Sequence, residues 1–240
     1  MKIIGVIPAR YGSKRFPGKP LAKICDKPMV QWVYEKAAKT KYLNRVIVAT
    51  DDVRIMRTVW SFGGEAMLTP KNIKSGTDRV AEVCNKIAAD VVVNIQGDEP
   101  LMATKTIDAI LEPFRKDARL LMTTAACPFK VLTDISDPNA VKVVCDSQDN
   151  ALYFSRSPIP YSRNPKSGSK TLRHMGIYAY RRDFLLRFTK WPQTALELAE
   201  SLEQLRALER GIRIRVVRVN QESIGVDTQS DLEKVTQLFK

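Results

Sequence analysis

Short apolar runs alternate with segments of helical periodicity through the first half of the chain. The runs at 2–7, 45–49 and 90–95 are each followed by a proline or polar residue, which is typical of buried strands in a parallel sheet. Apolar residues at helical spacing follow each run, and we expect helices at 28–40, 53–61, 77–88 and 104–115. This β-α-β-α order predicts a mostly parallel sheet with helices on both faces.

Beyond about residue 120 the strand-like runs crowd together. We expect strands at 121–127, 140–145, 151–155 and 174–180, then helices at 182–189 and 196–211, a strand at 213–219 and a helix at 228–239. Most of the four clustered strands are separated by turns alone, which favours antiparallel pairing. We therefore expect one α/β domain over 1–240, with a core at 1–120 and 212–240 and a second, more antiparallel part at about 121–211.

The composition is that of an ordinary soluble protein, with 44% hydrophobic and 27% charged residues among 240. The chain contains no apolar run of the roughly 18 residues that a membrane-spanning helix needs, and its opening segment is too short for a secretory signal. We expect a cytoplasmic protein. Four scattered cysteines without a CxxC pair argue against structural zinc, and the single histidine excludes any metal site that needs two.

The chain is strongly basic, with 39 Lys and Arg against 26 Asp and Glu, a net charge of +13. Such a charge favours an anionic partner, which could be nucleic acid, a membrane surface or a small phosphorylated or carboxylated substrate. The cations are spread out, without a block of five or six and without a recognised nucleic-acid motif. We expect small anionic substrates, and neither nucleic acid nor a membrane as a partner. The densest group of cations consists of Arg10, Lys14, Arg15 and Lys19.

That group lies in the loop that follows the first strand. Gly12, Ser13 and Gly18 let the backbone there turn its N–H groups toward an anion, and the cations around them would suit a triphosphate. The loop matches neither GxxxxGK[ST] nor GxGxxG. A basic surface turn is the alternative interpretation.

Acidic residues follow two other strands. Asp98 comes after the run at 90–95, where a carboxylate commonly holds a Mg²⁺ ion that bridges substrate phosphates, and Gly97 would let the backbone approach a ligand. Asp227 is a second candidate, although Asp227 or Thr228 could instead cap the last helix. A further polar segment, 75–79, opens a helix. It could cap that helix or contact a base, and the pattern does not separate the two.

Taken together, these segments resemble one family, the 3-deoxy-manno-octulosonate (Kdo) cytidylyltransferases. The resemblance covers essentially the whole chain, and the motifs occur in the same order as in the family. Any one motif is shared with broader nucleotidyltransferases, but RHMGIYAY and LEQLRALERG narrow the match. The segments are IPARYGSKRFPGKPL at 7–21, SGTDRVAEV at 75–83, NIQGDEPL at 94–101, YFSRSPIPY at 153–161, RHMGIYAY at 173–180, LEQLRALERG at 202–211 and GVDT at 225–228.

The resemblance implies a Rossmann-like nucleotidyltransferase fold, a homodimer and Mg²⁺ as cofactor. It implies that CTP and Kdo react to give CMP-Kdo and pyrophosphate for lipopolysaccharide biosynthesis in the cytoplasm. The core would bind the nucleotide, and the part at about 121–211 would bind the sugar and form the dimer. A cytidylyltransferase for a related acid sugar, such as a sialic acid or an amino-substituted Kdo, is the alternative.

The family pattern, carried onto matching positions, suggests roles for individual residues. Because the sugar hydroxyl attacks the α-phosphate in line, catalysis requires positioning and charge neutralisation, and no protein nucleophile is expected. The expected catalytic residues are Arg10, Lys19 and Asp98, and the expected metal ligands are Asp98 and Asp227. Nucleotide binding is expected from Ala9, Arg10, Gly12, Ser13, Arg15, Lys19, Ser75, Gly76 and Arg79.

Sugar binding is expected from Gln96, Arg156, His174, Tyr178, Glu203 and Gln204. Some of these residues also have a structural interpretation. His174 lies in an alternating strand and could be a core histidine. Glu203 and Gln204 are adjacent on an expected helix, about 100° apart, and nearby Arg206 could be an ion-pair partner or a ligand.

Overall fold

A computed structural model describes residues 1–12, 15–164 and 171–239. The chain forms two compact units. The first unit consists of Met1–Asp108, Ala179–Thr189 and Ser223–Lys240, and the second of Ala109–Tyr178 and Lys190–Glu222. No helix within the described ranges is both long and apolar enough to cross a membrane.

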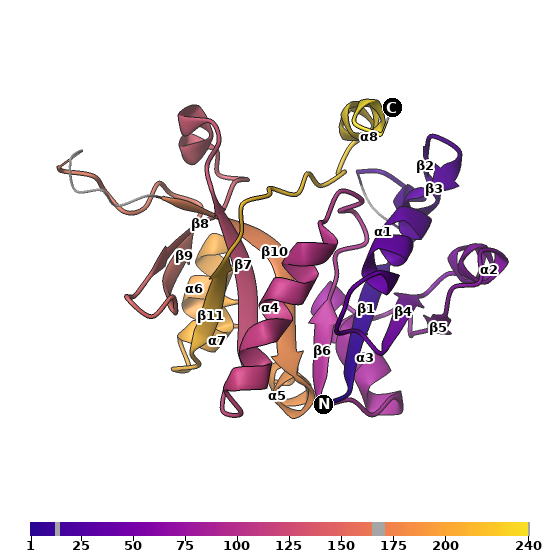
Figure 1. Cartoon of the computed structure of the whole chain (residues 1–240), viewed down its shortest axis with the longest axis horizontal. Helices are drawn as coiled ribbons and strands as arrows, with labels where there is room; N and C mark the ends of the chain where they lie inside the picture. The colour runs from indigo at the N-terminus through magenta and orange to yellow at the C-terminus, as the bar shows by residue number, and fades with distance from the viewer. Residues whose placement is uncertain (13–14, 165–170, 240) are drawn as a thin grey trace. The chain divides into compact units, whose positions relative to one another are not determined.

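A parallel sheet forms the centre of the first unit (Figure 1). Its strands lie in the order β6 (Val91–Asn94), β1 (Ile3–Ala9), β4 (Arg45–Thr50) and β5 (Ala66–Leu68). Val6 of β1 is in register with Ile47 on one side and Asn94 on the other. Six of the seven β1 residues are buried, as expected for a central strand covered on both faces. The predicted parallel sheet is confirmed.

The described residues of the first unit include five helices. α1 to α3 all pack against β4, and the sequence places each of the three correctly. The helices are α1 (Met29–Ala38), α2 (Val53–Ser61), α3 (Gly76–Lys86), α5 (Arg182–Phe188) and α8 (Gln229–Gln237). The periodicity misses the shortest elements, which carry too few residues to show a pattern. These are β5, a 3₁₀ turn at Lys19–Leu21 and the hairpin of β2 (Lys23–Ile24) with β3 (Lys27–Pro28).

The second unit combines parallel and antiparallel pairing. β7 lies between β11, its parallel partner, and β10, while β8 is antiparallel to both β9 and β10. The strands are β7 (Met122–Pro128), β8 (Lys142–Cys145), β9 (Ala151–Ser155), β10 (Leu172–Arg181) and β11 (Ile214–Arg218). The remaining elements are a 3₁₀ turn at Leu132–Ser136, α6 (Ala195–Glu200) and α7 (Leu205–Leu208). β10 and α4 (Thr104–Lys116) have residues in both units.

The prediction of a single helix over 196–211 is wrong, because this segment contains two short helices, α6 and α7. α6 ends at Glu200, the next residue, Ser201, adopts a left-handed conformation with φ of 51°, and α7 begins four residues after Ser201. Glu203 and Gln204 therefore lie in the connection rather than side by side on a helix. The break allows Arg206 to donate to the Glu197 carboxylate at 2.7 Å. On a continuous helix these two residues would lie about 13 Å apart on opposite faces.

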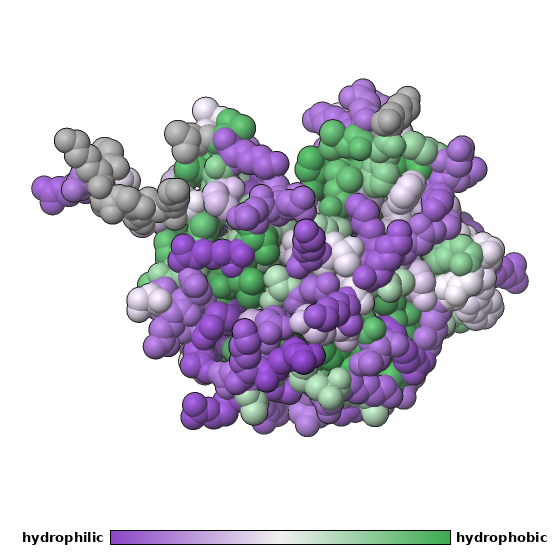
Figure 2. All heavy atoms as spheres, viewed as in Figure 1, coloured by the Kyte–Doolittle hydropathy of each residue, from purple (hydrophilic) through white to green (hydrophobic). Residues whose placement is uncertain are grey.

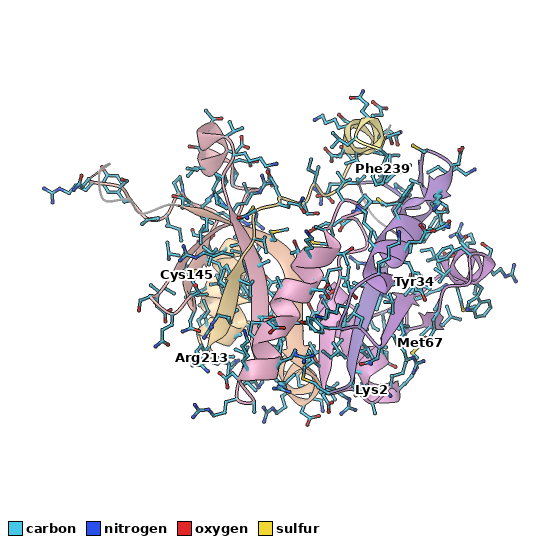
Figure 3. The ribbon with its side chains drawn as sticks, viewed as in Figure 1. Lys2, Tyr34, Met67, Cys145, Arg213 and Phe239 are labelled. Atoms are coloured by element: carbon cyan, nitrogen blue, oxygen red, sulfur yellow. The ribbon has the colours of Figure 1, made fainter. Side chains whose placement is uncertain are left out.

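The C-terminal helix α8 is held by an apolar cluster. Leu232 and Val235 of α8 are buried against Ile24 and Met29, and Val226 joins them. Partly buried side chains extend the cluster outward, and Figure 2 shows hydrophobic atoms beside α8. They include Phe239, labelled in Figure 3, whose ring centroid is 4.5 Å from that of Trp32. These contacts fix the N-terminal end of α8, which directly follows Asp227.

We expect Leu232→Ala to lower the free energy of unfolding by about 2–5 kcal/mol, the range for a buried leucine that leaves a cavity. Chemical denaturation measures this difference. Glu233→Ala, at the adjacent exposed position, serves as the control and should change stability by less than about 0.5 kcal/mol. Equal effects of the two substitutions would show that α8 is not anchored through its buried face.

Candidate active site

A cavity of about 470 Å³ opens at the carboxyl ends of β1 and β6 in the first unit. Its walls come from the loop after β1, the N-terminal end of α3, the loop after β6 and the segment before α8. Ligands of open parallel sheets bind at this edge, and a cavity of this size suits a nucleotide. Of the nucleotide-binding residues expected from the sequence, the described ones that line the cavity are Ala9, Arg10, Gly12, Arg15, Lys19, Gly76 and Arg79. Ser13 lies outside the described residues.

Gly97 allows the loop after β6 to pass close to β1. A Cβ atom at this position would lie 2.8 Å from the Pro8 carbonyl oxygen, closer than such atoms approach in proteins. The close neighbour of Gly97 is the backbone of β1, and Gly97 also lines the cavity, so its predicted approach to a ligand stays a prediction. The glycine thus brings Gln96 and Asp98, on either side of it, to the end of the central strand.

Lys19 lies between the two predicted metal ligands. Its Nζ donates to Asp98 Oδ2 at 2.6 Å and to Asp227 Oδ1 at 3.2 Å. Arg15 pairs with the other oxygen of Asp227 at 3.1 Å. The preceding residue, Gly18, has φ of +72°, a left-handed conformation that favours glycine and turns the loop into the 3₁₀ helix that Lys19 begins.

Asp227 is not the cap of α8. Thr228 accepts from the Asp231 N–H and completes a capping box, so the carboxylate of Asp227 points to the cavity instead. The neighbouring Val226 N–H donates to the Asp98 carbonyl oxygen at 2.8 Å. This backbone bond joins the two acidic segments directly.

The two carboxylates fit a divalent cation. They already hold one cationic group between them, and carboxylate oxygens with phosphate oxygens are the ligands that Mg²⁺ prefers. Within the described ranges, no group of three or more His, Cys, Asp or Glu side chains could hold a metal without other ligands. An ion here would need ligands beyond these two carboxylates, such as oxygens of a substrate or water.

The segment at 75–79 has both a structural and a cavity-facing part. Ser75 and Asp78 form the capping box of α3, which confirms the capping interpretation. Arg79 is fully buried and donates to Asp51 at 3.0 Å and to the Thr69 hydroxyl. Burial lowers the pKa of Arg79, and the Asp51 carboxylate opposes that shift. No acceptor for its buried Nε is found among the described residues.

The other sugar-binding candidates belong to the second unit, whereas Gln96 lines the cavity of the first. Burial raises the pKa of Tyr178 well above its usual value, and the nearby Glu203 carboxylate adds to this shift. Gln204 is 4% exposed, and its amide nitrogen has no acceptor within the described part of the chain. Arg206 pairs with Glu197, as the ion-pair interpretation expected.

Arg156 is held by backbone carbonyl groups. Its guanidinium donates to the carbonyl oxygens of Glu200 at 2.7 Å and Pro138 at 2.8 Å. Its own carbonyl oxygen accepts from the buried Lys142 ammonium, which also donates to the backbone carbonyl oxygen of Asp137 at 2.9 Å. Sequence analysis missed Lys142, although a lysine within an apolar strand was a visible signal.

His174 packs between two aromatic side chains on the second unit. Its ring centroid is 4.9 Å from that of Phe154 and 5.4 Å from that of Tyr178. Burial lowers the pKa of His174 to about 3, so the imidazole is neutral near pH 7. A neutral imidazole has one donor nitrogen and one acceptor nitrogen, and its partners decide which is which.

The Thr124 hydroxyl decides the tautomer of His174. This oxygen is 3.0 Å from His174 Nε2, 2.8 Å from the Ile177 carbonyl oxygen and 3.2 Å from the Met175 carbonyl oxygen. Carbonyl oxygens only accept, so they take the single hydroxyl proton and Nε2 has to donate to the hydroxyl oxygen. Nδ1 is then the acceptor nitrogen of the ring, suited to a hydroxyl of a ligand.

We expect ¹⁵N NMR of His174 to show the neutral Nε2–H tautomer from pH 7 down to about pH 4. The chain has one histidine, so the signals need no further assignment. Thr124→Val should yield a mixture of tautomers because the hydroxyl is lost, whereas Thr124→Ser should retain the Nε2–H form. A protonated imidazole at pH 6 in the unchanged protein would contradict this arrangement.

We expect Gly97→Ala to lower the stability of the protein by about 1–3 kcal/mol, since its Cβ would collide with backbone atoms. Thermal denaturation detects the change. Gly225→Ala is the control, because a Cβ there meets no atom of the described residues within 4 Å. If both variants melt like the unchanged protein, the loop after β6 does not lie against β1 as described.

Comparison with known proteins identifies the family. The cytidylyltransferase family model matches residues 4–214. A 3-deoxy-manno-octulosonate cytidylyltransferase of Geobacter sulfurreducens is 50% identical over 250 residues and covers 100% of each chain. One of Fusobacterium nucleatum is 48% identical over 242 residues, covering 100% of this chain and 98% of the relative.

Solved structures agree with this result. The structure of CMP:2-keto-3-deoxy-manno-octonic acid synthetase complexed with CTP is 46% identical, with a TM-score of 0.96 over 100% of this chain and 98% of the other. A 4-diphosphocytidyl-2C-methyl-D-erythritol synthase of Anaerococcus prevotii, 12% identical with a TM-score of 0.65, covers 99% of this chain and 98% of its own and shares the fold. The chain therefore belongs to the 3-deoxy-manno-octulosonate cytidylyltransferases, within the cytidylyltransferase family.

Proposed function

We propose that this chain transfers CMP from CTP to Kdo and releases pyrophosphate, and that the CMP-Kdo product serves lipopolysaccharide biosynthesis. The observation that carries the proposal is a cavity with four cationic side chains and two carboxylates at the carboxyl ends of β1 and β6. It occurs in a chain that matches a CTP-bound CMP-Kdo synthetase with a TM-score of 0.96. The names of the full-length relatives favour Kdo over a related acid sugar.

The cations would bind and neutralise the triphosphate. Arg10, Arg15 and Lys19 line the same cavity, and the backbone at Gly12 lies beside them. Arg10 Nη1 is 3.5 Å from the Lys74 carbonyl oxygen, at the limit of a hydrogen bond. Its guanidinium can therefore turn to phosphate oxygens, because this contact, which it would have to give up, is weak. Cations placed where negative charge grows on the leaving pyrophosphate stabilise the transition state of phosphoryl transfer.

Asp98 and Asp227 would hold Mg²⁺, because their carboxylates converge on one cationic position. When bound, the ion would polarise the α-phosphate and lower the pKa of the attacking hydroxyl group. The protein's own residues keep the two carboxylates in place through the backbone bond between Val226 and Asp98.

In the second unit, His174, Tyr178, Glu203 and Gln204 would recognise the hydroxyl groups of the sugar acid. The acceptor Nδ1 of His174 and the unpaired amide donor of Gln204 are complementary to hydroxyl groups. We propose Arg156 as the cation for the sugar carboxylate, and Gln96, which lines the first-unit cavity, as a further candidate for sugar binding.

A cytoplasmic homodimer is the form we propose for the protein. Leu152 and Leu198 of the second unit are 62% and 60% exposed, and an interface that covered them would bury apolar surface. CTP and Kdo, both anionic, account for the need for cationic sites.

We expect pyrophosphate release when the purified protein is incubated with CTP, Mg²⁺ and Kdo. N-acetylneuraminate in place of Kdo should give little release, and EDTA should abolish the reaction. Asp98→Asn should lower turnover by at least about a hundredfold, because a metal-binding carboxylate is lost. Asp183→Asn removes an exposed carboxylate that pairs with neighbouring Arg182 and should leave turnover unchanged.

Two results would count against the proposal. Release with N-acetylneuraminate but not Kdo would assign another acid sugar to the same fold. Near-normal turnover of Asp98→Asn would remove this residue from the metal site.

A further inference from the structure

We infer that Lys19 is a built-in counter-cation of the Asp98–Asp227 site, so that a divalent cation binds there only together with a triphosphate. This inference rests on the proposed function for the identity of the nucleotide. Lys19 Nζ contacts one oxygen of each carboxylate, at 2.6 and 3.2 Å. It thus stands where a metal ion shared by the two aspartates would have to bind.

The protein holds this ammonium group at the site. The Lys19 side chain is 14% exposed, compared with 33% for Asp98 and 49% for Asp227. Its backbone is fixed by the left-handed turn at Gly18 and by Pro20, which is buried. An ion pair of this kind is shielded from solvent more than a pair on an open surface, so salt weakens it less.

The carboxylates do not depend on Lys19 for their positions. Asp98 lies beside the glycine that packs against Pro8, and its carbonyl oxygen accepts from the Val226 N–H. Asp227 directly precedes Thr228, the capping residue of the anchored helix α8. Removal of the lysine side chain would therefore leave two carboxylates in place with one cation fewer between them.

The charges of this cluster balance without a metal. Two carboxylates face the Lys19 ammonium and the Arg15 guanidinium, so the sum is zero. A divalent cation entering this cluster would have to displace the ammonium or lie next to it, and either costs electrostatic energy in a partly buried site. Mg²⁺ also gives up its water ligands reluctantly.

A triphosphate changes this balance because it brings several negative charges into the cavity. The flexible four-carbon stem of lysine lets its ammonium turn from the carboxylates to phosphate oxygens. The carboxylates are then available to a metal ion. Lys19 would thus serve first as a substitute cation and then as a phosphate ligand, and the enzyme would take up metal and nucleotide together.

The experiment measures Mn²⁺ binding by EPR on the full-length protein without nucleotide. We expect weak binding by the unchanged protein and binding at least about tenfold tighter by Lys19→Met or Lys19→Gln. Lys19→Arg keeps the charge and should bind as weakly as the unchanged protein. Lys86→Met is the matched control, since it makes the same change in net charge at an exposed pair with Glu82.

Three results would overturn the inference. The first is equal Mn²⁺ affinity of the unchanged protein, Lys19→Met and Lys19→Gln, with the folding of both variants verified by circular dichroism. The second is an equal gain in Lys86→Met. The third is a gain that persists in Lys19→Met combined with Asp227→Asn. These measurements involve no turnover, so they are separate from the test of cytidylyl transfer.

Addition of CTP without Kdo provides the other half of the test. Mn²⁺ affinity of the unchanged protein should rise at least tenfold, and the rise should be smaller in Lys19→Met, where the competing cation is already gone. An equal rise in both proteins would contradict the exchange of Lys19 between carboxylates and phosphate. If CTP has no effect on either protein while the gain in Lys19→Met persists, the proposed nucleotide fails and the counter-cation role stands.

Discussion

The ion pairs of Lys19 with Asp98 and Asp227 join three parts of the chain at one cavity. Each part reaches that point for a different reason. The lysine follows a left-handed glycine, Asp98 follows a central strand, and Asp227 precedes a capped helix. Because opposite charges in a partly buried site need close contact to be stable, the cavity depends on all three segments being correctly packed. The electrostatics of the cavity is therefore linked to the packing of the C-terminal helix.

The close contact between backbone segments is as important for the arrangement of the cavity as the ion pairs are. The Gly97 position comes so near the Pro8 carbonyl that a side chain would not fit, and the neighbouring Val226–Asp98 bond continues the contact through the backbone. Chain segments that lie this close leave little freedom for the side chains beside them. Such rigidity suits an in-line transfer, in which small displacements of the reacting atoms have large effects on rate.

Polar groups buried in the second unit organise its candidate ligands. Lys142 donates to backbone carbonyls beside Arg156, Thr124 determines which nitrogen of His174 accepts, and Glu197 holds Arg206. A buried donor or acceptor without a partner destabilises a protein, so each of these groups restricts its neighbours to a few arrangements. The same restriction leaves the Gln204 amide and His174 Nδ1 suited to a ligand rich in hydroxyl groups.

The sequence by itself determined most of the longer helices and strands, their order along the chain and the types of residue that line the cavity, because apolar periodicity and residues at strand ends are local properties. The tertiary structure decided what local patterns do not contain. A left-handed residue, Ser201, breaks the helix predicted at 196–211 and allows Arg206 to bond a residue nine positions earlier, and Gly97 lies against the backbone of β1. Thr228, not Asp227, caps α8, which directs the aspartate to Lys19. The contacts of Gly97 with Pro8 and of Asp227 with Lys19 join residues distant along the chain, and only the packed fold brings such partners together.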